Sequence, residues 1–324
     1  MNGKSHWRIL MGAILALGIG SFQGALAYPT SNVRIVVPYA PGGATDVYAR
    51  LVAKSLADQL AIPVLVENRA GASTIVGAQA VARSAKDGGT LLFTTSTTFS
   101  SNPLLFKSLP YRIEDFAPVA LVGTSRLTLT ISATLGPKTL EEFVEHVRAR
   151  PGKVAMATIG TGSTTYLAGK TFERVYGLKM IDAPYKGSPE ALRALLAGEV
   201  SLYPDGIAGV LALHKAGKLR IVGTFTRERS RHVDDVPTFP ELGVDVVGQG
   251  WYGVFAPAKT PPATVARLSA IISEAVRNPD LRAKISAVGL DPTGTTPQEL
   301  AAIQKRDYDF WGPIIAASGF KPEQ

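Results

Sequence analysis

Several short segments of the chain follow one design, in which an apolar run ends in a loop of Gly, Ser, Thr or Asp and a helix follows. Two examples are clearest, because residues 33–37 lead into residues 41–46 and residues 154–158 lead into residues 160–164. The first turn of a helix has unpaired backbone N–H groups and carries about half a positive charge, so it attracts anions. Two such helix starts, far apart in the sequence, predict an acidic ligand held between two domains.

The order of elements predicts the fold class. Short runs rich in Val, Ile and Leu alternate with segments of helical period, which is typical of an α/β fold built from βαβ units with largely parallel sheets. Helix starts are expected where Thr139, Ser188, Thr260 and Thr296 precede helical segments. The predicted strands are 33–37, 63–67, 90–95, 119–131, 154–158, 180–184, 199–203, 219–225 and 246–256.

Two of these strands, 119–131 and 246–256, are long, and the segment between them holds its own set of alternating strands and helices. We therefore interpret them as crossovers between two domains. The first domain would comprise residues 28–125 and 250–324, and the second would be an insertion of residues 126–249. Two chain crossings form a hinge, which allows the domains to close around a ligand.

The N-terminus predicts export. Lys4 and Arg8 precede an apolar run over residues 9–19, and residues 25–27 form an A-x-A cleavage site, so residues 1–27 read as a signal peptide cleaved near Ala27. The apolar run is about half of the ~20 residues needed to span a bilayer. The chain has no cysteine, hence no disulfide and no lipid on an N-terminal Cys. We expect a periplasmic protein, in which the 324 − 27 = 297 remaining residues suit two domains.

The charge pattern gives no sign of a nucleic-acid partner. The chain carries a formal charge of +8, but its basic residues are scattered. Their one cluster, at residues 227–232, is interrupted by Glu228 and followed by two aspartates, as expected for a solvated loop rather than for a surface that follows phosphates.

The sequence also lacks a recognisable catalytic or metal-binding pattern. Ser163 lies in a Gly-Thr-Gly-Ser-Thr segment rather than in a Gly-x-Ser-x-Gly elbow, and the histidines at 146, 214 and 232 favour solvated structural roles. Spacings such as His-x-x-x-His are absent, and the Gly42-Gly43 pair belongs to neither a Walker loop nor a dinucleotide loop. We expect no enzyme, cofactor or metal; a secreted hydrolase and a ligand sensor feeding a kinase remain the alternatives.

A ligand is expected at the carboxyl ends of the strands, where open α/β sheets bind their ligands. Asp205 is the acidic residue expected in this cleft, where it would cap the next helix or accept hydrogen bonds from a ligand amine or hydroxyl. Tyr39, Tyr166, Tyr185 and Trp251 would either wall the pocket or belong to the core.

Several motifs resemble those of the Bug receptors, which are the extracytoplasmic solute receptors of tripartite tricarboxylate transporters. The resemblance runs in order along residues 29–320, nearly the whole mature chain. The matching segments are IVVPYAPGGATD at 35–46, VENRAGA at 66–72, LPY at 109–111, DFAPV at 115–119, PYKGS at 184–188, KAGKLR at 215–220 and FAPA at 255–258.

The resemblance implies a type II periplasmic-binding-protein fold, a carboxylate or amino-acid ligand, and delivery to a transporter with one large and one small integral subunit. It further implies that backbone amides, hydroxyls and bridging water hold a ligand carboxylate without an arginine clamp. We expect a monomer. The predicted ligand-binding residues are Tyr39, Ala40, Gly42, Gly43, Thr45, Asp46, Ser96, Thr97, Gly160, Thr161, Gly162, Ser163, Thr164, Tyr166, Tyr185 and Asp205.

Overall fold

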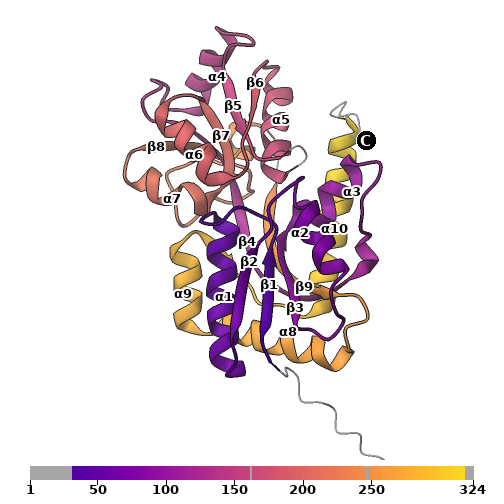
Figure 1. Cartoon of the computed structure of the whole chain (residues 1–324). Helices are drawn as coiled ribbons and strands as arrows, with labels where there is room; N and C mark the ends of the chain where they lie inside the picture. The colour runs from indigo at the N-terminus through magenta and orange to yellow at the C-terminus, as the bar shows by residue number, and fades with distance from the viewer. Residues whose placement is uncertain (1–30, 161–162, 245–247, 318–324) are drawn as a thin grey trace, which may run out of the picture.

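The computed structural model describes residues 31–160, 163–244 and 248–317. The predicted signal peptide and two predicted site residues, Thr161 and Gly162, lie outside these ranges. Within them, no helix combines the length and the apolar character that crossing a membrane requires. The described chain forms two α/β lobes, one above the other in Figure 1.

The first lobe, lower in Figure 1, is a mixed sheet with helices on both faces. Its strands are β1 (Val33–Val37), β2 (Val64–Asn68), β3 (Thr90–Thr95), the first part of β4 (Phe116–Ser132), β9 (Gln249–Pro257) and β10 (Leu290–Pro292). Its helices are α1 (Ala44–Leu60), α2 (Ile75–Ala82), the short turns η1 (Thr97–Ser101) and η2 (Ile113–Asp115), α3 (Asn102–Leu105), α8 (Pro262–Arg277), α9 (Pro279–Ala287) and α10 (Pro297–Ala317).

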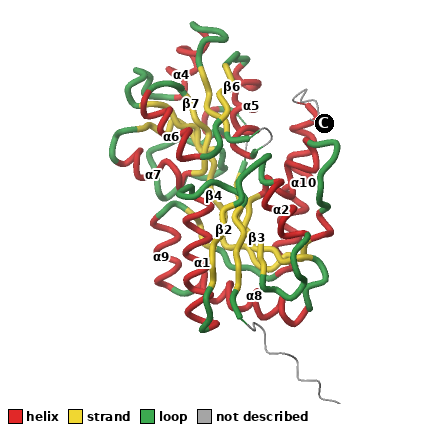
Figure 2. The backbone as a smooth tube through the Cα atoms, viewed as in Figure 1, coloured by secondary structure: helices red, strands yellow, loops and turns green. Residues whose placement is uncertain are grey.

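Alternation along the strands builds two cores in this lobe. Ile35 and Val37 of β1 pack with α1, α8 and α9, whereas Val36 packs on the opposite face with α2 and α10. Strand β1 runs parallel to β2 and β3, so the loops after β1 and β3 leave the sheet at the same edge. That edge faces the second lobe, and Figure 2 shows the loops, in green, at the level between the lobes.

The second lobe has a smaller sheet, in the order β6, β5, β7 and the second part of β4, with β8 also paired to β4. Leu129, Met156 and Leu202 of these strands pack with Phe143 and Phe172 of the helices in one core. The strands are β5 (Ala155–Thr158), β6 (Ile181–Pro184), β7 (Leu202–Gly206) and β8 (Leu219–Thr224); the helices are α4 (Leu140–Arg148), α5 (Thr164–Tyr176), α6 (Ser188–Ala197), α7 (Ile207–Lys215) and the short turn η3 (Pro240–Leu242).

Strand β4 belongs to both sheets. Its first part, up to Arg126, pairs with β9, and from Leu127 onward it pairs with β7 and β8. The chain returns beside it, since the Gly248 amide donates to the Phe225 carbonyl of the second lobe at 2.8 Å and Gln249 then pairs with Arg126. The two-lobed architecture with two crossings is thus as predicted; the domain boundaries at 125 and 250 stay a prediction.

One strand is displaced from its predicted position. The prediction of 199–203 ended the strand before Pro204, but β7 covers Leu202–Gly206. The antiparallel partner explains the difference, because Thr128 and Leu127 of β4 face Asp205 and Gly206 in the register. Asp205 therefore belongs to a strand rather than to the loop that follows one.

Two of the four predicted helix caps are confirmed. The Thr139 and Thr296 hydroxyls accept hydrogen bonds from backbone amides three residues later, at 3.2 and 3.3 Å. The prediction is wrong for Thr260, which donates to the Pro257 carbonyl, and for Ser188, whose hydroxyl bonds to Asp205 while Gly187 takes the cap position. In both cases the hydroxyl has another partner nearby.

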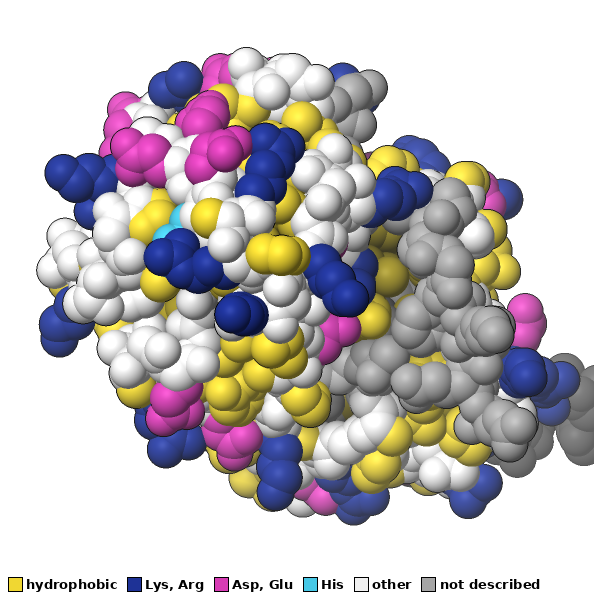
Figure 3. Space-filling model, turned by 90° about the horizontal axis from the view of Figure 1, so that it is seen from above, with side chains coloured by type: hydrophobic (Ala, Val, Ile, Leu, Met, Phe, Trp, Pro, Cys, Tyr) yellow, Lys and Arg dark blue, Asp and Glu magenta, His cyan; other side chains and the backbone are white. Residues whose placement is uncertain are grey.

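Charges of both signs are interspersed on the molecular surface seen from above the second lobe in Figure 3. Lys and Arg side chains lie among acidic, apolar and neutral ones on this face. The described residues on this face therefore form no continuous basic stripe of the kind that follows a nucleic-acid backbone.

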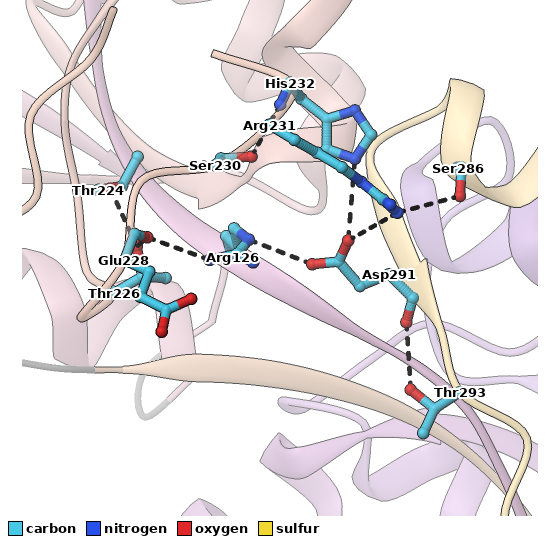
Figure 4. A network of polar contacts seen from close by, with 10 residues as sticks. All are labelled: Arg126, Thr224, Thr226, Glu228, Ser230, Arg231, His232, Ser286, Asp291 and Thr293. Atoms are coloured by element: carbon cyan, nitrogen blue, oxygen red, sulfur yellow. Dashed lines mark hydrogen bonds and ion pairs between the residues drawn. The ribbon is translucent and has the colours of Figure 1, made fainter. Parts of the chain in front are cut away.

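A polar network joins the lobes beside the crossing (Figure 4). Asp291 of β10 accepts hydrogen bonds from Arg126 of β4 at 3.1 Å and from Arg231, in the loop after β8, at 3.2 Å. His232 lies 3.9 Å from the same carboxylate, and burial lowers the pKa of this histidine, although Asp291 acts in the opposite direction. We call Asp291, Arg126, Arg231 and His232 the interlobe clasp.

Candidate ligand-binding site

A cavity of about 670 Å³, including its mouth, lies between the lobes. Both lobes and the crossing strands contribute to its wall. From the first lobe come residues of the loops after β1 and β3, and from the second lobe come residues at the starts of α5, α6 and α7. Ser125 of β4 and Trp251 of β9 contribute from the crossing. The interface between two lobes is a position where proteins commonly hold small ligands.

Five of the described helices and turns begin at this wall. Helix α1 starts at Ala44, η1 at Thr97, α5 at Thr164 and α6 at Ser188, and the cap residue of α7, Gly206, also lines the cavity. Each start presents backbone N–H groups that lack intrahelical acceptors and adds a partial positive charge. The sequence design of strand, polar loop and helix therefore produces one concentrated region that favours an anion.

Hydroxyl groups line the first-lobe side. The Tyr39 hydroxyl lies 2.6 Å from that of Thr95, and the Thr97 amide donates to Thr95 at 3.4 Å. Burial raises the pKa of Tyr39 above its ordinary value, so its hydroxyl stays protonated at neutral pH. This wall offers neutral groups that both donate and accept hydrogen bonds.

The second-lobe side is fixed by the cap of α5. The Ser163 hydroxyl accepts from the Tyr166 amide at 3.1 Å and lies 2.9 Å from the Thr165 hydroxyl. Thr164 reaches across the cavity, where its hydroxyl lies 2.8 Å from that of Ser96 in the first lobe. The lobes are thus in direct polar contact at the wall of the cavity.

Asp205 is the acidic residue of the described wall, and it is 6% exposed. Its Oδ2 accepts from the Ser188 hydroxyl at 2.7 Å, and its Oδ1 accepts from the Gly206 amide at 2.8 Å. Ser188 in turn lies 2.6 Å from the Tyr203 hydroxyl. Burial raises the pKa of Asp205 to about 6, although these hydrogen bonds act in the opposite direction.

No lysine, arginine or histidine is among the residues found to line the cavity in the described part of the chain. The same part contains no cluster of three or more His, Cys, Asp or Glu residues that could hold a metal ion. Any charge on a bound anion would therefore be balanced by helix starts, amides and hydroxyls.

The structure brings nine of the sixteen predicted site residues together around the cavity. Most of them carry a hydroxyl or carboxyl group, and the others belong to the loop after β1. The nine are Tyr39, Ala40, Gly43, Thr45, Ser96, Thr97, Ser163, Thr164 and Asp205.

Five other predicted residues lie away from the wall. Gly42 lines a neighbouring hollow between α1 and α6. Gly160 has a φ of +86° and faces Ser73 of the first lobe, so closely that a Cβ there would lie 2.8 Å from the Ser73 hydroxyl. Tyr166 packs against the cluster that contains Trp311, and Tyr185 is partly buried against the cluster that includes Ala191 of α6.

Asp46, the fifth of these, serves the loop itself. Its carboxylate accepts from the Gly42 amide at 2.9 Å, from Asn68 at 2.9 Å and from Arg50 at 3.0 Å. Burial acts to raise the pKa of Asp46, but these hydrogen bonds outweigh it and lower the pKa below its ordinary value. Asp46 therefore holds the loop after β1 in shape while facing away from the cavity.

Among the wall residues that sequence reasoning missed, two groups lie outside the predicted loops. Gly187, Ser188 and Pro189 follow β6 and begin α6, so the strand, loop and helix design that marked the other loops could have found them. Ser125 and Tyr252 lie within long strands, where no loop motif marks them. They line the cavity because β4 and β9 cross there, which only the register of the two strands reveals.

Comparisons with known proteins agree with this architecture. The family model described as tripartite tricarboxylate transporter family receptor, TctC, matches residues 48–320. Protein BugT of Bordetella pertussis is 35% identical over 311 residues, which cover 95% of each chain.

Two solved structures from Rhodopseudomonas palustris have the same fold. MatC with bound malate is 32% identical, with a TM-score of 0.85 over 89% of this chain and 100% of that one. Rpa4515 with adipate is 28% identical, with a TM-score of 0.87 over 90% of this chain and 98% of that one. The predicted type II periplasmic-binding-protein fold is confirmed, and the chain belongs to the TctC family of periplasmic tripartite tricarboxylate transporter receptors and is of the Bug type.

Proposed function

We propose that this protein captures a small organic carboxylate by closure of its two lobes and delivers it to a tripartite tricarboxylate-type transporter. The observation that carries the proposal is the interlobe cavity, where helix starts and hydroxyls from both lobes converge. This arrangement favours a negatively charged ligand even though the described wall has no cationic side chain. The malate and adipate bound to MatC and Rpa4515 support a carboxylate as the ligand class.

The energetics require closure. A helix start contributes about 0.3 to 2 kcal/mol toward an anion, whereas a micromolar complex needs about 8 kcal/mol. The part of this binding free energy that the helix starts do not supply is expected from charge-assisted hydrogen bonds to Ser, Thr and backbone groups, at about 1.5 to 3 kcal/mol each. Both lobes supply such groups, so a ligand gains most when they close on it and exclude water.

The sequence supports a periplasmic location for this ligand capture. Residues 1–27 would direct export and be removed near Ala27, leaving a monomeric periplasmic receptor hinged near residues 125 and 250. Its partners would be the large and small integral subunits of the transporter. Because the family is one of receptors, we infer that the ligand, a carboxylate or an amino acid, is released unchanged.

The proposal can be tested on the mature protein purified under native conditions. Native mass spectrometry identifies any small molecule that co-purifies, and calorimetry of the stripped protein measures binding of a panel of mono-, di- and tricarboxylates. We expect at least one carboxylate to bind with micromolar affinity or better and to be recovered intact. Absence of binding across the panel, or steady conversion of a bound compound to product, contradicts the proposal.

A further inference from the structure

The described wall of the cavity carries one acidic side chain and no basic one, which affects how an anionic ligand can bind. Asp205 is the carboxyl group of the described wall, and none of the described wall residues is a lysine, arginine or histidine. A ligand carboxylate that enters this cavity therefore meets a second acid without a cation between them.

The side chain of Asp205 is held in one orientation and cannot rotate away from a ligand carboxylate. Its two oxygens are held by Ser188 at 2.7 Å and by the Gly206 amide at 2.8 Å. Helix α7 packs directly behind it, where a Cβ on Gly209 would collide with Oδ2. The residue is 6% exposed, so bulk water offers its charge little screening.

Within the described ranges, the other titratable groups that face Asp205 are phenols. Tyr203 comes from β7 itself, Tyr252 from β9 and Tyr48 from α1, and the charge of Asp205 affects each of them. Burial raises the pKa of all three above their ordinary value, so they are uncharged at neutral pH. Ser188 of α6 and Thr128 of β4, which also contact Asp205, do not titrate in this range.

Two carboxylates that share one buried site cannot both remain ionised easily, and one of them takes up a proton. In the ligand-free protein, Asp205 already accepts a hydrogen bond from the amide of Gly206, the cap residue of α7. When a ligand carboxylate enters the cavity beside it, Asp205 becomes the more easily protonated of the two, since burial already favours its neutral form.

We propose that the protein binds its ligand carboxylate together with one proton, which Asp205 holds. The proton comes from the solvent and bonds to a carboxylate oxygen of Asp205, and no other covalent bond forms or breaks. The inference rests on the proposed function and narrows it to acids that lack an ammonium group, because an ammonium would pair with ionised Asp205 instead.

Calorimetry of the stripped mature protein tests this, with malate and adipate as first probes and the wider carboxylate panel behind them. Titrations between about pH 6 and pH 8.5, in buffers of different ionisation enthalpy, give the number of protons taken up per ligand bound. We expect the uptake to rise from about half a proton near pH 6 toward one proton near pH 8, and the affinity to fall by about tenfold per pH unit above about pH 7.

Two variants show which residue takes up the proton. Asp205→Asn mimics the neutral carboxyl, so we expect it to take up no proton and to bind with a flat pH profile. Asp307→Asn is the control, because burial also raises the pKa of Asp307 to about 6 but its carboxylate bonds to Trp251 rather than lining the cavity. This control should retain the proton uptake of the wild type.

The outcomes separate the inference from the proposed function. Carboxylate binding without proton uptake, or affinity that falls as the pH is lowered toward 6, overturns the inference and leaves the proposed function standing. Absence of carboxylate binding at every pH overturns the proposed function and the inference with it. If Asp205→Asn fails to fold, the proton count of the wild type alone decides.

Discussion

At the scale of single residues, Asp205 links the cavity to the stability of the ligand-free protein. Its pKa is raised from 3.8 to about 6, so its contribution to stability is complete below about pH 4 and is lost as the pH rises through 6. With about 1.36 kcal/mol per pKa unit, the loss amounts to about 3 kcal/mol. We expect denaturant unfolding of the ligand-free protein to show this loss between about pH 4 and pH 7.5, relative to Asp205→Asn.

The matched control for this residue is Asp58→Asn, which removes a carboxylate whose side chain is 65% exposed on α1. Its unfolding profile should follow that of the wild type. If the profile of Asp205→Asn also followed the wild type, Asp205 would be ionised at no cost in the folded protein, and burial would not raise its pKa.

At the scale of elements, a helix start can stabilise its helix and can also bind the ligand. A pair of variants separates these two roles. Ser163 caps α5 and lines the cavity, whereas Thr139 caps α4 far from it. We expect Ser163→Ala and Thr139→Ala each to lower the free energy of unfolding by about 1 kcal/mol. Only Ser163→Ala should also weaken ligand binding, by about tenfold, since it alone removes a hydroxyl from the cavity wall. Equal affinities of the two variants by calorimetry would contradict this.

Elements with local sequence signals could be predicted, whereas elements positioned by pairing with distant strands could not. The loops after β1, β3 and β5 carry their own local signals of Gly, Ser and Thr, so the sequence indicated eight of the residues that line the cavity there. The position of β7 depended on its pairing with β4, and the contribution of Ser125 and Tyr252 depended on the register of β4 with β9. These contacts join residues far apart in the chain, which periodicity and turn residues do not report.

At the scale of the whole molecule, closure requires the lobes to fit together beside the cavity. A Cβ on Gly187 of the second lobe would lie 3.1 Å from the Cβ of Ala40 in the first lobe, tighter than an ordinary contact. We expect Gly187→Ala to hold the lobes apart and weaken ligand binding several-fold. The double variant Ala40→Gly with Gly187→Ala should recover the affinity, because it restores the space. Failure of the second change to rescue the first would show that the lobes do not meet here in the bound state.

The interlobe clasp acts at the same scale, since Asp291 joins β10 of the first lobe to Arg126 and Arg231 (Figure 4). Asp291→Asn is expected to cost about 1 kcal/mol of unfolding free energy at low salt and less at high salt, because these pairs are partly exposed. Asp309→Asn, which breaks an exposed pair with Lys305 on α10, is the control and should change stability less. A cost for Asp291→Asn no larger than that of the control would argue against the clasp.

Main-chain amides and neutral hydroxyls from opposed lobes are the groups that we propose hold an acidic ligand. A crystal structure of the mature protein with its carboxylate ligand would decide whether they do. We expect the ligand carboxylate in the interlobe cavity, within hydrogen-bond distance of backbone N–H groups or hydroxyls at the starts of α1 and α5. A ligand bound elsewhere, or one whose charge is neutralised by an arginine, a lysine or a metal ion, would contradict this mode of binding.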